Sequence, residues 1–420
     1  MVAIIIGIFI VGYLLIVFEH QIKLDKAASA LITGVLCWTA YIVSSHDVEA
    51  VNHHLYEHIG EVSGILFFLI GAMTIVELID LYDGFQIIID KIKTTNKRTL
   101  LLIITALSFL LSALLDNLTT AIVMTSLVTK ILPDKKDRLV TIGMIIIAAN
   151  AGGAWSPIGD VTTTMLWIGN QITAGGIIKS IILPSIVATA VPFLYLMTKL
   201  KGNFTPIEFK KDNHTNDFDR NVIFYSGISL LIFVPIFKTV THLPPFMGMM
   251  LSVGILWFIS ETLHKRNKNV SNSETTIFSA LEKIDMPSIL FFLGILLAVG
   301  SLQAAGILTD MAGWLSEKVN NDIAILSGIG VLSSIFDNVP LVAAIQGMYD
   351  LKTYPTGDFF WNYLAYCAGT GGSILIIGSA AGVAAMGIEK ISFFWYVKNI
   401  SIAALLGYAA GAIACILLLA

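Results

Sequence analysis

The sequence predicts an all-α polytopic membrane protein made of two inverted repeats, each with a re-entrant hairpin and a broken transmembrane helix. The first observation is composition. Of 420 residues, 56% are hydrophobic and 13% are charged, about half the charged share of a soluble domain. The second is length, because apolar runs of about 20 residues, enough to cross a bilayer, recur along the chain. The third is a set of polar motifs that occur twice.

The duplicated motifs lie about 220 residues apart in the chain. Three matches in one order, at nearly one spacing, indicate an internal duplication of the kind that builds many transporter folds. The pairs are Ser112-Ala-Leu-Leu-Asp116-Asn117 with Ser333-Ser-Ile-Phe-Asp337-Asn338, Gly152-Gly-Ala-Trp-Ser-Pro-Ile-Gly159-Asp160 with Gly371-Gly-Ser-Ile-Leu-Ile-Ile-Gly378-Ser379, and Ile65-Leu-Phe-Phe-Leu69 with Ile289-Leu-Phe-Phe-Leu293.

Polar segments divide the chain into four parts. We expect N-terminal scaffold helices in residues 1–58, a first repeat in 59–200, a cytoplasmic linker in 201–220 and a second repeat in 221–420. We interpret the apolar residues 2–18 as a spanning helix rather than a signal peptide. No basic region precedes them, and no small-residue cleavage site follows.

The distribution of Lys and Arg predicts which segment ends face the cytoplasm, because basic loops stay on that side. Residues 99–129 lie between two basic segments, so we interpret them as a re-entrant hairpin with Asp116 and Asn117 at its tip. The second hairpin, at 323–348, lies between lysine-poor segments and enters from outside. This inverts the topology of the second repeat. The alternative is two tight pairs of ordinary helices joined by polar turns.

A broken helix follows each hairpin, at about 139–168 and about 359–386. Pro157 interrupts the first by removing a backbone donor, whereas glycines alone open the second. Non-helical backbone at membrane depth is tolerated where it is buried or lines a cavity, and its free carbonyls can bind a monovalent cation. The alternative is loose helix packing through small residues. The polar side chains at the breaks are Asn150, Asp160 and Thr162 in the first copy, and Thr370, Ser373 and Ser379 in the second.

Asp116 and Asp337 are the central candidates for chemistry. An ionised carboxylate at the bilayer centre costs about 2.5–3.5 kcal/mol on insertion scales and usually marks an ion or proton path. Desolvation favours the protonated carboxyl, whereas a bound cation favours the ionised form, so one site can hold either a proton or a cation. That competition is sufficient for antiport. The alternative is that both residues only cap the helices at the hairpin tips.

The motifs predict two cation sites, one in each copy. In each, the Asn offers a carbonyl oxygen and the upstream Ser a hydroxyl, and Asp160 with Thr162 forms the facing wall of the first. Ser379 stands where the first copy has Asp160, so we expect the first site to hold the cation more tightly. The predicted Na⁺ ligands are Ser112, Asp116, Asn117 and Asp160 at one site, and Ser333, Asp337 and Asn338 at the other.

Two further groups of polar residues are less specific. Glu77 and Asp80 are either interfacial carboxylates or part of a proton relay. His54 and His58 have the spacing of one helix face and could bind a metal or sense pH, but a solvated external loop over 46–61 is the expected structure. The sequence has no nucleotide-binding loop, zinc triad or basic nucleic-acid stripe, so we expect no cofactor, no enzyme activity and no nucleic-acid partner.

These motifs resemble the NhaD-type sodium/proton antiporters of the ion transporter superfamily. The resemblance runs from about residue 10 to the end and includes Gly71-Ala-Met-Thr-Ile-Val-Glu77. It implies a scaffold domain, a transport domain, a homodimer and elevator-like alternating access. It also implies cation sites between each hairpin tip and the facing break, Gly153–Gly159 in one copy and Gly372–Gly378 in the other. Relatives that transport carboxylates have Ser-Asn-Thr at the hairpin tips, where this chain has aspartates beside the asparagines. Each aspartate adds a titratable negative charge beside a cation site, and this charge favours proton exchange.

We therefore expect a multi-pass protein of a bacterial cytoplasmic (inner) membrane that exchanges Na⁺ or Li⁺ for H⁺. The nearest alternative is a cation-coupled carboxylate carrier or an arsenite-type anion exporter of the same superfamily. An intramembrane aspartyl protease also uses two embedded aspartates, but these must share a proton. Its Tyr-Asp and Gly-x-Gly-Asp motifs do not surround Asp116 or Asp337.

Overall fold

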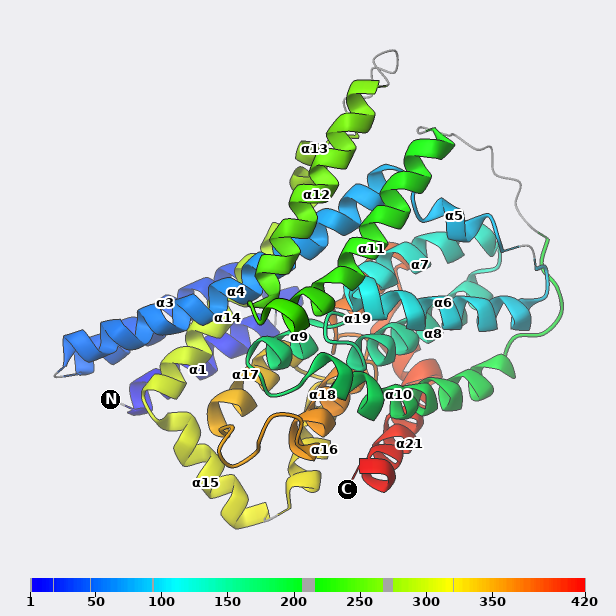
Figure 1. Ribbon diagram of the computed structural model, residues 1–420. Helices are drawn as coiled ribbons and strands as arrows, with labels where there is room; N and C mark the ends of the chain where they lie inside the picture. The colour runs from blue at the N-terminus through cyan, green and yellow to red at the C-terminus, as the bar shows by residue number, and fades with distance from the viewer. Residues whose placement is uncertain are drawn as a thin grey trace.

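The computed structural model describes residues 2–17, 19–45, 47–92, 94–205, 216–266, 275–319 and 321–419. Within these ranges the regular structure is helical, apart from one isolated β-bridge between Asn96 and Asn203. Nine of the described helices are long and apolar enough to cross a membrane. The prediction of a helical polytopic membrane protein is thereby confirmed (Figure 1).

The helices follow the sequence motifs closely. Those before residue 200 are α1 (Val2–Val17), α2 (Glu19–Ile22), α3 (Lys26–Ser44), α4 (Val48–Leu81), α5 (Gln86–Ile89), α6 (Lys97–Leu115), α7 (Asn117–Ile131), α8 (Lys135–Ala154), α9 (Val161–Ile168) and α10 (Ala174–Met197). The later ones are α11 (Asp217–Thr241), α12 (Pro245–Arg266), α13 (Ile277–Lys283), α14 (Met286–Ala304), α15 (Ile307–Val319), α16 (Asp322–Leu332), α17 (Asn338–Met348), α18 (Phe359–Gly371), α19 (Ala380–Glu389), α20 (Phe393–Tyr396) and, after a π-helical turn at Val397–Ser401, α21 (Ile402–Leu419).

The core of the molecule is made by the helices that precede the two breaks. α8 is buried from Leu139 to Ala154, and α18 is buried from Phe360 to Gly371. The two helices contact each other, α6 packs on α8, and α16 packs on α18. The second helix of each hairpin contacts the short helix of the other copy, α7 with α19 and α17 with α9. The two copies are therefore interlocked around the breaks.

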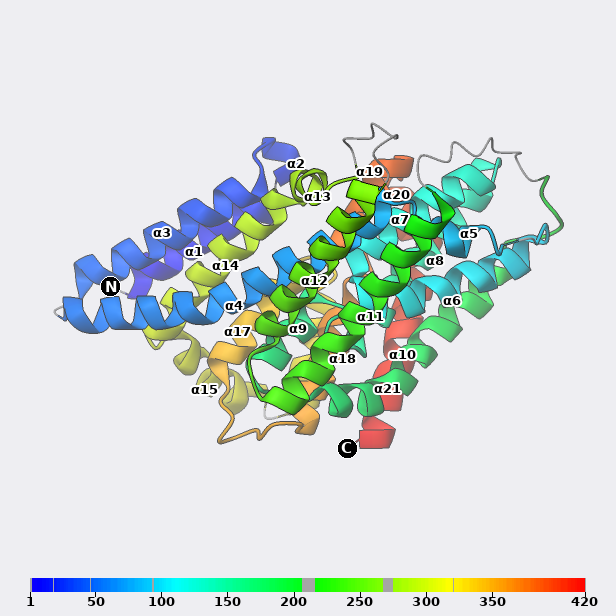
Figure 2. The same cartoon turned by 45° about the horizontal axis from the view of Figure 1, so that its top comes forward.

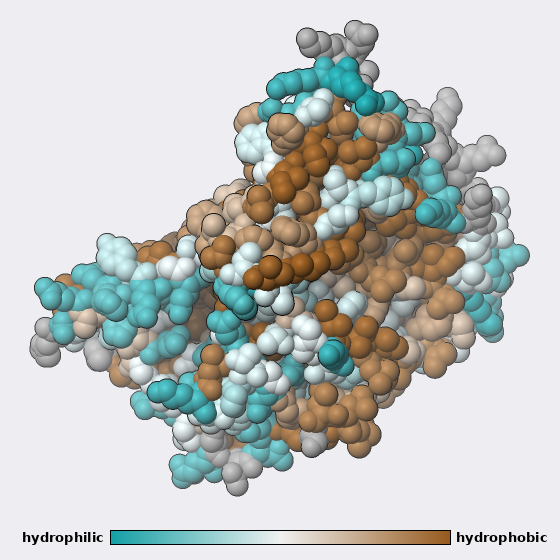
Figure 3. All heavy atoms as spheres, viewed as in Figure 1, coloured by the Kyte–Doolittle hydropathy of each residue, from teal (hydrophilic) through white to brown (hydrophobic). Residues whose placement is uncertain are grey.

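Other helices surround this core. α3 packs along α14, and α4 crosses both, so that these helices form the arm at the left of Figure 1. α11 and α12 pack together, and α10 packs on α21. Apolar atoms cover much of α11 and α12 in Figure 3. Ile236 of α11 and Leu251 and Phe258 of α12 are exposed large apolar side chains. An exposed apolar face of this kind suits contact with lipid.

The expected external loop over 46–61 is wrong for the residues that the structure describes. Asp47 caps α4 by accepting a 2.9 Å hydrogen bond from the N–H of Ala50, and the helix then runs unbroken for 34 residues to Leu81. The histidines and acids continue a helix that is longer than the about 20 residues of a span. A polar segment of this kind is typical of a loop, but Asp47 is a capping residue and marks the start of a helix. His46 lies outside the described residues.

Candidate ion-binding site

Asp160 is the centre of a buried polar network. It stands where the chain resumes a helix after the break between α8 and α9, and it is 2% exposed. Its Oδ1 accepts hydrogen bonds from the Thr162 N–H at 2.9 Å and the Thr162 hydroxyl at 2.7 Å. An aspartate in this position satisfies free N–H groups of the first helical turn. Asp160 thus caps α9 and also places a carboxylate in the buried core.

Both hairpin tips reach this carboxylate. Asn117, the first residue of α7, donates its Nδ2 to Asp160 Oδ2 at 2.6 Å. Asn338, the first residue of α17, has its Nδ2 3.3 Å from each Asp160 oxygen. The motifs assigned the two amides to different sites, whereas the folded chain brings them to one carboxylate.

The network continues from the first copy into the second through Asn150. The Asn117 amide also donates to Asn150 Oδ1 at 3.1 Å, and Asn150 Nδ2 donates to the Ser379 hydroxyl oxygen at 3.0 Å. Ser379 caps α19 by accepting from the Gly382 N–H at 3.2 Å. Asn150 is fully buried on the last turn of α8. Asn117, Asn150, Asp160, Thr162, Asn338 and Ser379 therefore form one connected cluster.

Ser112 and Ser333 hold the hairpin tips to the breaks in the same way. The Ser112 hydroxyl donates to the Ala149 carbonyl at 2.5 Å, and the Ser333 hydroxyl donates to the Ala368 carbonyl at 2.9 Å. The glycines allow this close approach. A Cβ on Gly159 would lie 2.7 Å from the Ser112 carbonyl oxygen, and one on Gly378 would lie 2.5 Å from the Ser334 carbonyl oxygen.

Asp116 and Asp337 both cap a tip helix, as the capping alternative predicted. Asp116 accepts from the Thr119 N–H at 2.7 Å and the Thr119 hydroxyl at 3.0 Å. Asp337 accepts from the Val339 N–H at 3.2 Å, and its other oxygen lies 3.6 Å from Lys26 Nζ. Capping does not prevent these aspartates from also binding an ion, because each carboxylate can accept more hydrogen bonds or ligands than these.

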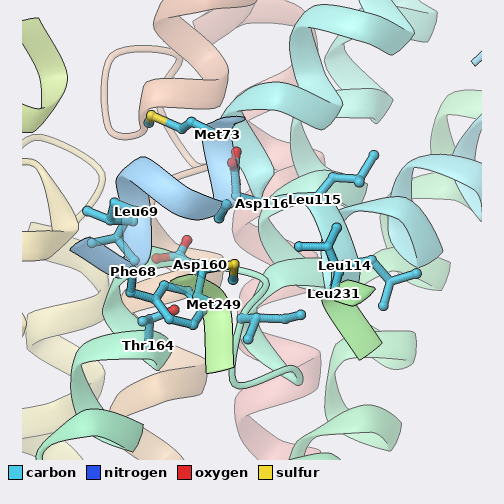
Figure 4. A pocket seen from close by; sticks show the side chains of 13 residues that line it. Phe68, Leu69, Met73, Leu114, Leu115, Asp116, Asp160, Thr164, Leu231 and Met249 are labelled. Carbon is cyan, nitrogen blue, oxygen red and sulfur yellow. The ribbon is translucent and has the colours of Figure 1, made fainter. Parts of the chain in front are cut away.

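Asp116 and Asp160 line one narrow pocket between the tip of the first hairpin and helices α4, α11 and α12. Figure 4 shows both carboxylates among apolar side chains from several helices. In such a low-dielectric setting, interactions between charges are stronger than in water. The labelled apolar neighbours are Phe68, Leu69 and Met73 of α4, Leu114 and Leu115 of α6, Leu231 of α11 and Met249 of α12.

Four other candidates have different surroundings. The Thr370 hydroxyl donates to the Tyr366 carbonyl at 2.6 Å, and the Ser373 hydroxyl donates to the Thr370 carbonyl at 2.7 Å. Both hydroxyls therefore bond to the backbone of α18. Glu77 is half-buried and Asp80 is exposed near the C-terminal end of α4, with Lys283 as a charged neighbour.

The histidine segment does not form a metal centre in the described part of the chain, where no group of three His, Cys, Asp or Glu side chains could hold an ion. His58 Nε2 lies 2.8 Å from the Leu296 carbonyl oxygen of α14. Its ring also fills the space where a Cβ on Gly300 would stand. His58 thus fixes the crossing of α4 and α14.

Lys26 is the residue at this site that the motifs missed. It is the first residue of α3 and belongs to none of the duplicated motifs. A lysine side chain at the start of an apolar helix is long enough to place its amine inside the protein. The sequence alone does not show that its partner is Asp337.

The chain is similar to known cation transporters over nearly its whole length. A family model described as "Citrate transporter" matches residues 13–361. "Sodium/proton antiporter 1" of Arabidopsis thaliana is 45% identical over 96% of this chain and 70% of the relative, and "Sodium/proton antiporter 2" of the same plant is 43% identical over 96% of both. "Na(+)/H(+) antiporter NhaD" of Vibrio parahaemolyticus is 30% identical over 91% of this chain and 98% of the relative.

Proposed function

The chain belongs to the citrate transporter family and, within it, to the NhaD-type sodium/proton antiporters, and we propose that it exchanges Na⁺ or Li⁺ for H⁺ at the carboxylates around Asp160. The observation that carries this proposal is the buried Asp160 carboxylate, which accepts hydrogen bonds from the tips of both hairpins. Intramembrane carboxylates of this kind mark cation and proton paths in transporters.

The two amides suit a site that alternates between ions. In the described geometry Asn117 and Asn338 turn their NH₂ groups to the Asp160 carboxyl group. An amide carries both a donor and an acceptor, so a rotated amide would turn its carbonyl oxygen to the site. That oxygen can bind Na⁺ or accept a hydrogen bond from a protonated Asp160. The same two side chains can therefore interact with the site when it is empty, when it holds Na⁺ and when Asp160 is protonated.

The break supplies further oxygen ligands and a favourable field. Hydroxyls of Ser112 and Ser333 hold the tips against the last turns of α8 and α18. The C-terminal end of a helix carries a partial negative charge, and unwound carbonyls with half-helix ends coordinate cations in transporters with inverted repeats. We propose that Asp116 is the second carboxylate of this binding region, that Asn338 and Ser379 complete it from the second copy, and that Glu77 and Asp80 lie on the path to it.

The same proposal includes re-entrant hairpins of opposite orientation. Lys97 at the start of α6 pairs with Asp137 at 2.5 Å, and α7 ends just before α8, so both ends of the first hairpin lie together. Tyr354, which follows α17, donates its hydroxyl to Asp322 at the start of α16 at 2.8 Å, which brings the ends of the second hairpin together. In Figure 2 the outer end of α7 lies at the top right and the loop after α17 at the bottom.

Inverted repeats, a moving transport domain, a homodimer and a bacterial cytoplasmic membrane are also parts of this proposal, supported by the resemblance to NhaD-type proteins. The relatives come from both plants and bacteria, so the membrane is the part that localisation experiments must fix. The multi-pass character itself follows from the nine candidate spans among the described helices.

Reconstitution into vesicles that contain a pH dye tests the exchange. We expect Na⁺ or Li⁺ added without any organic substrate to change the internal pH. We also expect the apparent affinity for Na⁺ to rise with pH, because protons compete for the same carboxylates. A pH change that needs an added carboxylate would support the carrier alternative, and an affinity independent of pH would argue against a shared site.

A further inference from the structure

The second hairpin tip carries its own fixed cation. Lys26 Nζ lies 3.6 Å from Asp337 Oδ2 and 4.5 Å from the centroid of the Phe291 ring. Both charged side chains are largely shielded, with 28% of Lys26 and 19% of Asp337 exposed. By contrast, the hydrogen-bond donors that the structure gives Asp116 are the neutral groups of Thr119. The two tip carboxylates therefore differ in charge compensation.

The scaffold holds Lys26 in this position. Asp25 caps α3 by accepting from the Ala27 N–H at 2.7 Å, so the first turn that carries Lys26 is fixed. α3 packs along α14, which supplies Phe291. On the hairpin side, the ring of Phe336 lies 5.3 Å from that of Tyr13 in α1. The titratable groups that face Asp337 are Tyr13 of α1, Lys26 of α3 and Asp160 at the start of α9.

We propose that Lys26 is a resident cation for the second hairpin tip, so that Asp337 binds neither the transported Na⁺ nor the exchanged proton. The Lys26–Asp337 pair is neutral as a unit, and the ammonium occupies a position from which it repels a second cation. Exchange is then confined to Asp116 and Asp160, and Lys26 acts as a positioning residue for the second tip. This inference rests on the proposed sodium/proton exchange and concerns where in the site it takes place.

Charge-pair substitutions in the full-length protein test this inference. Asp337→Asn leaves the Lys26 ammonium uncompensated near Asp160, and we expect the apparent Na⁺ affinity to fall about tenfold, as expected when one partner of a shielded pair is removed. The double variant Lys26→Gln, Asp337→Asn removes both charges, and we expect it to recover most of the lost affinity. A double variant as impaired as Asp337→Asn alone would overturn the inference, since Asp337 would then be needed for the transported ions themselves.

Three controls make the result specific. Lys26→Gln should not rescue Asp116→Asn, because Asp116 has no ion pair with Lys26; rescue there would overturn the inference by showing a general effect of net charge. Lys26→Arg should retain Na⁺ affinity, and Lys23→Gln, an exposed neighbour, should have no effect. If the unsubstituted protein itself shows no Na⁺-dependent pH change, the proposed function fails, independently of the comparison among the variants.

Discussion

The two hairpin tips share a backbone arrangement and differ in charge. In both, a serine hydroxyl donates to a backbone carbonyl near the C-terminal end of the facing helix, and a glycine of the break lets the tip approach. Both tip asparagines lie near Asp160 of the first copy, and the equivalent residue of the second copy is the neutral Ser379. Asp337 has an ammonium beside it, and Asp116 has neutral donors. The two copies of the motif thus share the backbone arrangement of the candidate site and differ in its charges.

The backbone of the first tip also differs from that of the second. Asp116 has φ of 77° and ψ of 162°, a region that residues with a side chain rarely adopt, while Asp337 has φ of −55°. Unfavourable backbone geometry of this kind is retained mainly where it serves function. Together with the neutral donors that the described residues give Asp116, it supports our proposal that the first tip is the part of the site where ions bind and are released.

The largest effect should come from removing the first-copy charges. We expect the double variant Asp116→Asn, Asp160→Asn to lose Na⁺-dependent proton movement by more than about a hundredfold, beyond what the loss of an outer ligand partner causes. The dye assay measures this loss, with membrane insertion checked by detergent-extracted yield. Near-normal exchange would remove the distinction between the two tips.

Replacing the tip asparagines should also have a larger effect at the first tip than at the second. Asn117 donates to Asp160 at 2.6 Å and also to Asn150, while Asn338 lies at 3.3 Å from both Asp160 oxygens. We expect Asn117→Ala to lower the apparent Na⁺ affinity about a hundredfold and Asn338→Ala about tenfold, within the range seen for outer-shell partners. Equal effects would show that the tips contribute equally.

The glycines should show where the tips are equivalent. Gly159→Ala and Gly378→Ala each place a methyl group against a hairpin carbonyl, and we expect each to destabilise the fold by about 1–3 kcal/mol, as overpacking does. Thermal unfolding in detergent measures the change. Gly387→Ala is the matched control, because a Cβ there meets nothing within 4 Å. A large difference between the first two variants would contradict a shared backbone arrangement.

The smallest functional effect should come from two single-cysteine variants, one at the outer end of each hairpin, that are labelled to determine topology. In a background without Cys37, Cys367 and Cys415, we expect Lys135→Cys to react from the cytoplasmic side and Lys352→Cys from outside. Both lysines are exposed, so activity should be retained. Labelling of both from the same side would rule out opposite hairpin orientations and, with them, the inverted repeat.

The local features of the fold could be predicted from the sequence. The first break follows from Pro157 and its glycines, and the observed interruption runs from Trp155 to Asp160 between α8 and α9. The tips follow from aspartates that precede asparagines, and α7 and α17 begin at those asparagines. Capping residues and helix breakers act over a few residues, so a sequence shows them directly.

The contacts between the copies could not be predicted in this way. Asn338 and Asp160 are 178 residues apart, and Lys26 reaches Asp337 from a helix outside both repeats. Their meeting depends on how α7 and α17 cross to the short helices of the opposite copy, which no local pattern specifies. The helical histidine segment differs from the prediction for another reason. The residues after Asp47 are polar, which is typical of a loop, although Asp47 itself is a helix cap.

The interlocked copies also have a consequence for biosynthesis. When a ribosome has delivered the first repeat to the membrane, Asp160 has Asn117 and Thr162 as partners, but Asn338 enters 178 residues later. Domains form as synthesis proceeds from the N-terminus. Asp160 therefore lacks the Asn338 donor until the second hairpin has been synthesised and inserted. A chain truncated at residue 200 would therefore lack Asn338, the donor that the second hairpin contributes to the proposed ion site.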